Sequence, residues 1–210
     1  MDLNRHRVGF VPGPGAQIVH YSGPFGTFGY PACRYGGPMP IYALGDKTPR
    51  IHPDSFIHPD AVIIGDVTIG SESSVWPCAV LRGDVASITV GQQTSIQDGS
   101  VIHVSTGVPT IIGNRCTIGH NAHLEGCTVF DDCLIGSGAV VLHHVLVGPH
   151  ALIGASAMVP NNKVIPEYAK AMGVPVRIIE NALVDVDFNR GVDTYVANVH
   201  LYSGHLRRLD

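Results

Sequence analysis

The sequence predicts an all-β solenoid, a parallel β-helix that is followed by a C-terminal α-helix. The main observation is an aliphatic residue at every sixth position over much of residues 51–159. A sustained period of six fits neither an α-helix nor a two-layer sheet, and it is the hexapeptide signature of a β-helix. The composition agrees, because 25 glycines and 15 prolines favour a chain with many turns over a helical bundle.

The repeat defines the solenoid, which we expect to cover residues 50–167. Each hexad should form one short strand and one corner, and three hexads should close one coil of a triangular prism with the aliphatic residue pointing inward. A small residue often follows four places later, where the chain bends. The aliphatic series comprises Ile57, Ile63, Ile69, Val75, Leu81, Val90, Ile96, Ile102, Ile112, Ile118, Leu124, Val129, Ile135, Val141, Val147, Ile153 and Val159.

The repeat is interrupted at three places. The spacing grows to nine residues after Leu81 and to ten after Ile102, and it falls to five after Leu124. Loops that interrupt a solenoid often carry function, so we expect functional residues beside these positions.

The segments on either side of the repeat lack its period. Residues 1–49 are rich in glycine, proline and aromatic residues, and we expect an extended arm whose rings lie on a surface. Residues 168–210 are expected to form a helical segment, because apolar residues from Val192 to Tyr202 recur at spacings of three and four. Such a helix must bury its apolar stripe, and the side of the prism is the available surface.

The net charge bears on the partners of the protein, and the cysteines and apolar runs bear on its location. A net charge of −4 gives no electrostatic reason to expect a nucleic acid or an anionic membrane as a partner. The five cysteines form no CxxC pair, which is typical of reduced thiols in a cytoplasmic protein. The first residues contain no apolar run like that of a signal peptide, and no apolar stretch is long enough to cross a bilayer. We therefore expect a cytoplasmic protein.

The register of the repeat also places a group of possible metal ligands. Arg82, His103 and Glu125 each follow an inward aliphatic residue, so they should form an outward stack spaced by about 4.8 Å. His103 and Glu125 would then be neighbours that can share one ion. His120 lies in the hexad between them, on another face, and should reach that ion only from a second copy of the prism. The repeat therefore predicts a metal site between subunits related by three-fold symmetry.

The other histidines can be interpreted as ordinary surface residues instead of metal ligands. The chain has 12 histidines, and a single outward histidine is more often a surface residue than a ligand. We expect His123 not to be a ligand, although it flanks Leu124 and could replace Glu125 or carry protons. His143, His144 and His150 are expected to lie at the surface.

Three segments resemble the gamma-class carbonic anhydrases: AVLRGDVASITVG, TSIQDGSVIHV and IGHNAHLEGCTV. The resemblance covers the chain from about Pro49 onward, and it implies a left-handed β-helix that forms a homotrimer with zinc between subunits. It implies hydration of carbon dioxide to bicarbonate, with His103 and His120 as metal ligands. Arg82 and Asp84 match a pair that bridges subunits beside the metal. Gln97 matches a residue that positions the bound water or bicarbonate.

One departure from the family concerns the third ligand. The family has a histidine five residues after the position of His120, and this chain has Glu125 there. Two histidines and a carboxylate suit zinc and also iron(II). The added negative charge should make the bound water less acidic than at a three-histidine zinc, where its pKa is about 7. Hydration activity should then be weak or lost.

Two alternatives therefore remain. The chain could be a gamma-class relative without hydration activity, either an assembly scaffold or a metal site for another small substrate. A hexapeptide acyltransferase that uses coenzyme A shares the solenoid, but the RGD, IQD and GH motifs favour the anhydrase branch.

Overall fold

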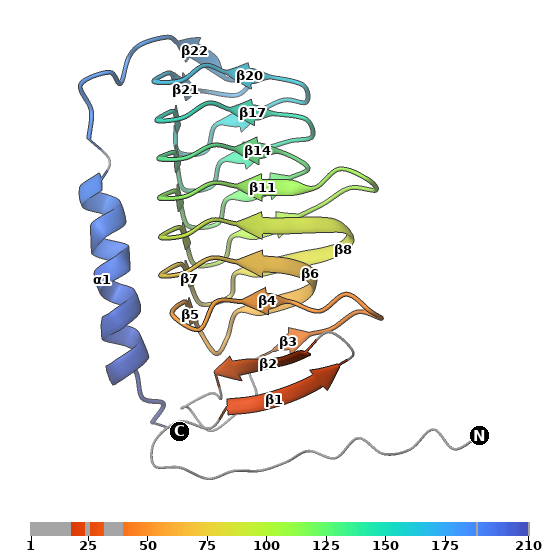
Figure 1. The fold of residues 1–210 in the computed structure, drawn as a ribbon. Helices are drawn as coiled ribbons and strands as arrows, with labels where there is room; N and C mark the ends of the chain where they lie inside the picture. Colours follow the sequence, from red (N-terminus) through yellow and green to blue (C-terminus); the bar gives the residue numbers. More distant parts are fainter. Residues whose placement is uncertain (1–17, 24–25, 32–39, 188, 210) are drawn as a thin grey trace.

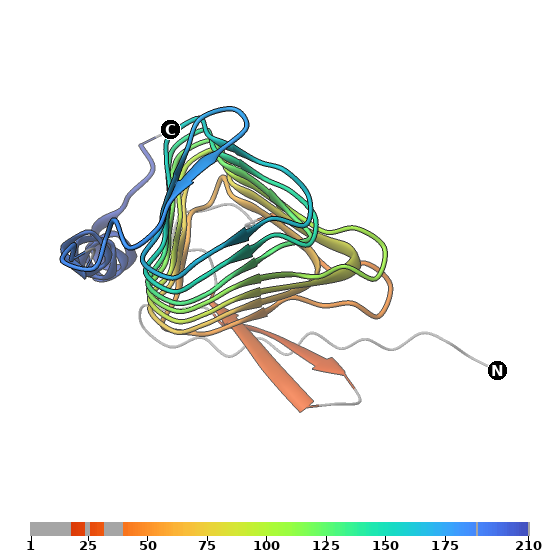
Figure 2. The same cartoon turned by 90° about the horizontal axis from the view of Figure 1, so that it is seen from above.

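A computed structural model describes residues 18–23, 26–31, 40–187 and 189–209 (Figure 1). The chain forms a parallel β-solenoid of about 7 coils with one helix beside it. Seen along its axis the solenoid is a triangular prism, and its coils wind in the left-handed sense (Figure 2). The fold class predicted from the six-residue repeat is confirmed.

The prism has three faces, which we call the helix face, the site face and the front face. The helix face consists of β5 (Phe56–Ile57), β7 (Ser74–Val75), β9 (Ser95–Ile96), β12 (Thr117–Ile118), β15 (Leu134–Ile135), β18 (Leu152–Ile153), β21 (Lys170–Met172) and the antiparallel β22 (Arg177–Ile179). The site face contains β3 (Ile41–Tyr42), β10 (Val101–His103), β13 (His123–Glu125), β16 (Val140–Val141) and β19 (Met158–Val159). The front face contains β4 (Arg50–Ile51), β11 (Thr110–Ile112), β14 (Thr128–Val129), β17 (Leu146–Val147) and β20 (Val164–Ile165).

Two long strands join the site face to the front face. β6 (Val62–Ile69) and β8 (Val80–Val90) bend around the corner and pair with each other along both faces. The enlarged spacing after Leu81 therefore becomes part of a continuous strand. The ten-residue spacing after Ile102 instead forms a loop, closed by an antiparallel bridge between Ser105 and Val108.

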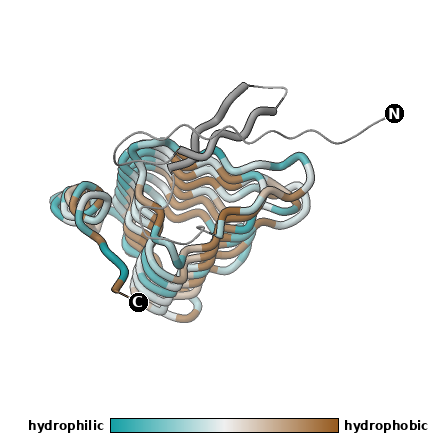
Figure 3. The backbone as a smooth tube through the Cα atoms, turned by 90° about the horizontal axis from the view of Figure 1, so that it is seen from below, coloured by the Kyte–Doolittle hydropathy of each residue, from teal (hydrophilic) through white to brown (hydrophobic). Residues whose placement is uncertain are grey.

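The core is the column of aliphatic side chains inside the prism. All members of the predicted series are buried, with at most 6% exposure. Hydrophobic positions recur at matching places on successive coils (Figure 3), and the aliphatic residues there are buried in one core cluster. The small residues expected near the corners are also buried, because the interior narrows there: Ala61, Ala79, Cys116, Ala122, Ala139, Ala151 and Ala157.

Helix α1 (Asn189–His205) lies along the helix face beside β5 and β7 (Figure 1). Its Val199 is buried against Phe56 and Trp76, and Tyr195, Tyr202 and Leu206 pack against this cluster. The indole Nε1 of Trp76 donates to the hydroxyls of Ser74 and Ser95 at 2.9 and 3.0 Å. The expected helix thus buries its apolar stripe on the prism. Within the described residues, no helix combines the length and hydrophobicity needed to span a membrane.

The N-terminal segment contains an antiparallel pair, β1 (Ile18–Gly23) and β2 (Gly26–Pro31). The expected contacts of its aromatic rings lie outside the part of the chain whose side chains are described. The division into residues 1–49, 50–167 and 168–210 stays a prediction. Pairing of β3 with β6, and of β21 with β18, extends the solenoid sheets past both boundaries.

Candidate metal centre

The parallel register of the site face brings His103 and Glu125 together. Ile102 pairs with Leu81 on one side and Leu124 on the other, so His103 is directly opposite Glu125. Nδ1 of His103 lies 3.3 Å from Oε1 of Glu125. The two side chains point outward from neighbouring strands, β10 and β13, as the repeat predicts.

Asp84 approaches the other ring nitrogen of His103. Its Oδ1 lies 3.3 Å from Nε2 of His103 and accepts a 2.9 Å hydrogen bond from the backbone N–H of Val85. Its Oδ2 accepts a hydrogen bond from Nη1 of Arg82. Burial raises the pKa of Asp84, but the hydrogen bond and charge of Arg82 outweigh it and hold the pKa below its usual 3.8. The imidazole of His103 therefore lies between two carboxyl groups, of which Asp84 is held ionised.

The spacing of His103 and Glu125 fits two ligands of one tetrahedral ion. Ligands at the usual zinc distance of about 2.0–2.1 Å lie about 3.3–3.4 Å apart, because a tetrahedron's edge is about 1.6 times its centre-to-vertex distance. The observed distance is 3.3 Å. Within the described part of the chain, no group of three His, Cys, Asp or Glu side chains is arranged to hold a metal ion. One chain thus supplies a pair of donors at ligand spacing.

Glu125 has further neighbours that the sequence did not indicate. Ser105 donates to Oε1 of Glu125 at 3.1 Å, and Nε2 of His143 lies 3.3 Å from the same oxygen. Nε2 of His123 lies 3.4 Å from Oε2. His143 was expected to be an ordinary surface residue, but it contacts Glu125. The signal for this contact is Gly126, because its missing side chain leaves room for a ring from the next coil.

The ionisation of Glu125 reflects these contacts. Burial raises its pKa, while the hydrogen bonds from His143 and Ser105 and the charges of His103 and His143 lower it. The net effect holds the pKa of Glu125 below its usual 4.5, so the side chain is a carboxylate at neutral pH.

The remaining predicted residues form a second group at another corner. Nδ1 of His120 lies 2.9 Å from Oδ2 of Asp98, and both side chains are about half exposed, at 49% and 48%. Gln97 precedes Asp98 on the helix face and is buried. The structure therefore brings Arg82, Asp84, His103 and Glu125 together. It places Gln97 and His120 apart from them within one chain, as the register predicts for His120.

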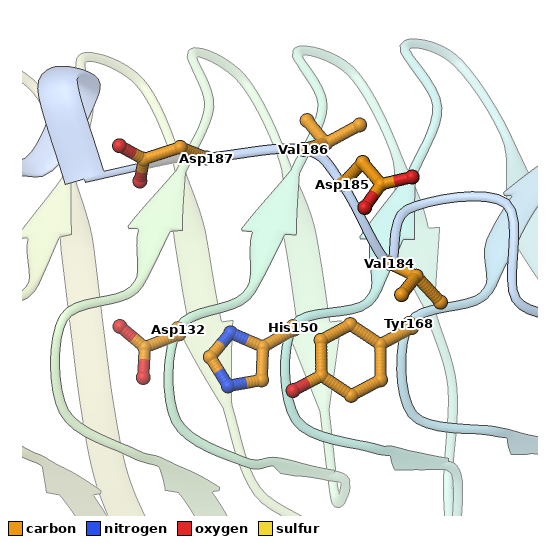
Figure 4. A pocket seen from close by; sticks show the side chains of 7 residues that line it. All are labelled: Asp132, His150, Tyr168, Val184, Asp185, Val186 and Asp187. Carbon is orange, nitrogen blue, oxygen red and sulfur yellow. The ribbon is translucent and has the colours of Figure 1, made fainter.

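A separate cleft lies between one corner of the prism and the segment before α1 (Figure 4). Asp132, His150 and Tyr168 line it from successive coils, and residues 184–187 line it from the other side. The rings of His150 and Tyr168 are stacked with centroids 4.8 Å apart. None of the predicted site residues lines this cleft.

Comparison with known proteins decides the family. The model of the family "Bacterial transferase hexapeptide (six repeats)" matches residues 48–83 and 126–161. The "Probable carbonic anhydrase" of Methanocaldococcus jannaschii is 44% identical over 147 residues, which cover 64% of this chain and 92% of that protein. The chain belongs to the gamma carbonic anhydrase-like family of hexapeptide-repeat proteins. The RGD, IQD and GH motifs indicate the same family.

Other relatives share parts of the chain. "Gamma carbonic anhydrase 1, mitochondrial" of Arabidopsis thaliana is 45% identical over 140 residues, or 64% of this chain. The chain spans only 51% of that relative and 39% of "Gamma carbonic anhydrase 2, mitochondrial". A solved hexapeptide transferase family protein from Anaplasma phagocytophilum is 29% identical, with a TM-score of 0.72. The alignment covers 78% of this chain and 98% of that structure.

Proposed function

We propose that this member of the gamma carbonic anhydrase-like family interconverts carbon dioxide and bicarbonate at a zinc site between the subunits of a cytoplasmic homotrimer. The observation that supports it best is the 3.3 Å pair of His103 and Glu125 beside the Arg82–Asp84 ion pair. The similarity to proteins named carbonic anhydrases supplies the reaction. The cytoplasmic location rests on Cys78, Cys116, Cys127 and Cys133, which are free thiols.

The metal would be held by His103 and Glu125 of one copy and His120 of a second copy. Iron(II) is an alternative to zinc, because two histidines and a carboxylate suit both. Asp98 occupies the Nδ1 side of His120, which leaves Nε2 as the nitrogen for a metal.

The outer surface of the site face supports contact with a second copy. One column of outward residues on this face is apolar except for His123, and we call it the apolar column. It consists of Val62, Val80, Val101, His123, Val140 and Met158. Apolar residues gathered on an outer surface favour a protein contact, and the column runs beside His103 and Glu125.

The residues of this chain have distinct tasks in the proposed reaction. Zinc, when bound by His103, Glu125 and His120, would supply Lewis acidity toward water. Arg82 is held by Asp84 and presents a cation that can bind the oxygens of bicarbonate. Gln97 is buried beside Asp98 in the copy that supplies His120, and its match to the family's positioning residue gives it the task of orienting the substrate. Glu125 adds a negative charge, which lowers the Lewis acidity and should slow the reaction.

The test is metal analysis combined with stopped-flow hydration of carbon dioxide. The wild-type protein should elute as a trimer, carry metal, and hydrate carbon dioxide slowly. Glu125→His should hydrate it faster, because a neutral ligand restores Lewis acidity. His144→Asn, a change at an exposed histidine nearby, should behave like the wild type. The proposal fails if the wild type hydrates no carbon dioxide, whether or not it holds metal.

A second candidate is a relative without hydration activity, and Glu125 is the observation that favours it. Such a protein would be an assembly scaffold or would use its metal on another small substrate. A trimer that binds metal but hydrates no carbon dioxide, even as Glu125→His, would support this candidate.

A further inference from the structure

Two loops of the prism enclose the carboxylate of Glu125. Ser105 comes from the loop after β10, and His143 follows β16 on the opposite side of β13. Oγ of Ser105 lies 2.8 Å from Nε2 of His143 and donates to Oε1 of Glu125 at 3.1 Å. Because the hydroxyl proton goes to Glu125, the Ser105 oxygen accepts from His143. Nε2 of His143 also lies 3.3 Å from Oε1 of Glu125, so the three side chains form a closed cluster in which His143 and Ser105 both face that oxygen.

The surrounding backbone holds the side chains of His143, Ser105 and Glu125 in place. Ser105 and Val108 exchange two backbone hydrogen bonds, of 3.3 and 2.8 Å, so the loop is closed on itself. Gly126 lies under the ring of His143, since a Cβ built on it would be 3.0 Å from Cδ2 of His143. Thr110 accepts a 2.8 Å hydrogen bond from the Gly126 N–H. The room that His143 needs to lean toward Glu125 is therefore part of the fold.

The contacts of this cluster meet at the Glu125 oxygen that faces His103. Oε1 of Glu125 is the atom 3.3 Å from Nδ1 of His103, and it is also the atom bound by Ser105. A free glutamate side chain can rotate about three bonds, so a fixed carboxylate loses less freedom when a cation arrives. Partners that orient a ligand in this way typically raise metal affinity 10–100-fold.

We propose that Ser105 and His143 are positioning residues that hold Glu125 at ligand spacing from His103 for a divalent cation. The proposal rests on the metal site of the proposed function, but not on carbon dioxide as substrate. In this role His143 touches neither substrate nor metal, and it acts on Glu125 both directly and through Ser105.

The experiment measures zinc affinity of the full-length protein by competition with a chromophoric chelator, and records the visible spectrum of the cobalt(II) form. Ser105→Ala and His143→Ala should each bind zinc 10–100-fold more weakly, with an altered cobalt(II) spectrum. His143→Gln should keep most of the affinity, because its amide can still donate to Ser105. His144→Asn is the matched control, since His144 is exposed and its φ of 58° suits asparagine.

Thermal unfolding of the metal-free variants separates positioning from a loss of folding. The proposal predicts melting close to that of the wild type together with weakened zinc binding. It is overturned if Ser105→Ala and His143→Ala bind zinc as the wild type does, or if His144→Asn loses as much affinity as His143→Ala.

Failure of the metal site itself is recognised separately. If the wild type binds no divalent cation, crystal structures of the metal-free wild type and of His143→Ala test whether His143 positions the Glu125 carboxylate. A Glu125 carboxylate that leaves His103 in the variant supports positioning, and an unmoved carboxylate overturns it.

Discussion

Gly126→Ala tests the packing around Glu125 without removing any polar group. Gly126 has a φ of 61°, in the left-handed region that favours glycine. A side chain there costs about 1–2 kcal/mol in backbone energy. The new Cβ would also lie 3.0 Å from both Cδ2 of His143 and Cγ1 of Val108, closer than normal contact. The methyl group should therefore push His143 away from Ser105.

Gly138→Ala provides the matched control. Gly138 has a similar φ of 68°, and its built Cβ meets no atom closer than Oγ of Ser156 at 3.3 Å. Both variants should lose about 1–2 kcal/mol of unfolding free energy from the backbone alone. Only Gly126→Ala should also lose zinc affinity, by the 10–100-fold expected when an orienting partner is displaced.

Urea unfolding of the metal-free proteins and chelator competition measure the two effects. Equal zinc affinity in Gly126→Ala and Gly138→Ala would refute the reasoning, because the position of His143 would then not matter to the metal. A Gly126→Ala protein as stable as the wild type would show that the corner tolerates a Cβ.

Three further predictions address the core, the second corner and the effect of pH. Leu124→Ala should lower the free energy of unfolding, measured with urea, by about 2–5 kcal/mol, because Leu124 is fully buried. Val164→Ala, at a 58% exposed position, should change it by about 0.5 kcal/mol or less. Similar losses in the two variants would contradict the assigned core. Asp98→Asn should weaken zinc binding about 10–100-fold in chelator competition while gel filtration shows an intact trimer, because His120 loses its anionic partner; unchanged affinity would exclude this role. Burial lowers the pKa of His58 below its usual 6.5, against the opposing charges of Asp60 and Asp98. The unfolded chain therefore binds a proton at His58 more readily than the folded chain does. His58 should leave the stability unchanged above pH 6.5 and reduce it as the pH drops below that value. The urea midpoint should therefore drop more for the wild type than for His58→Asn between about pH 7.5 and 5.5, and parallel curves would count against this.

The solenoid could be predicted from the sequence because one local rule is repeated. An inward aliphatic at every sixth position needs no knowledge of distant contacts, and the register alone places His103 beside Glu125. The contact of His143 could not be predicted in the same way. It crosses from one coil to the next at a corner, over a glycine, and corners do not share the outward stacking of the strands.

The docking of α1 was predictable only in outline. The spacing of its apolar residues indicated an amphipathic helix, but the repeat gave no special role to Trp76. The structure shows that Trp76 holds the helix through ring contacts and binds two buried hydroxyls beneath it. That arrangement depends on Ser74 and Ser95 lying on adjacent coils.

At the upper end of the prism, the last strand of the helix face reverses its direction. β22 runs antiparallel to β21, and the turn between them exchanges hydrogen bonds with Met158 through Gly173 and Val176. On the helix face, a second prism that approached end-on would meet a strand of reversed direction instead of an open parallel edge. The reversal thus opposes strand-to-strand stacking of another sheet on the helix face at this end of the prism.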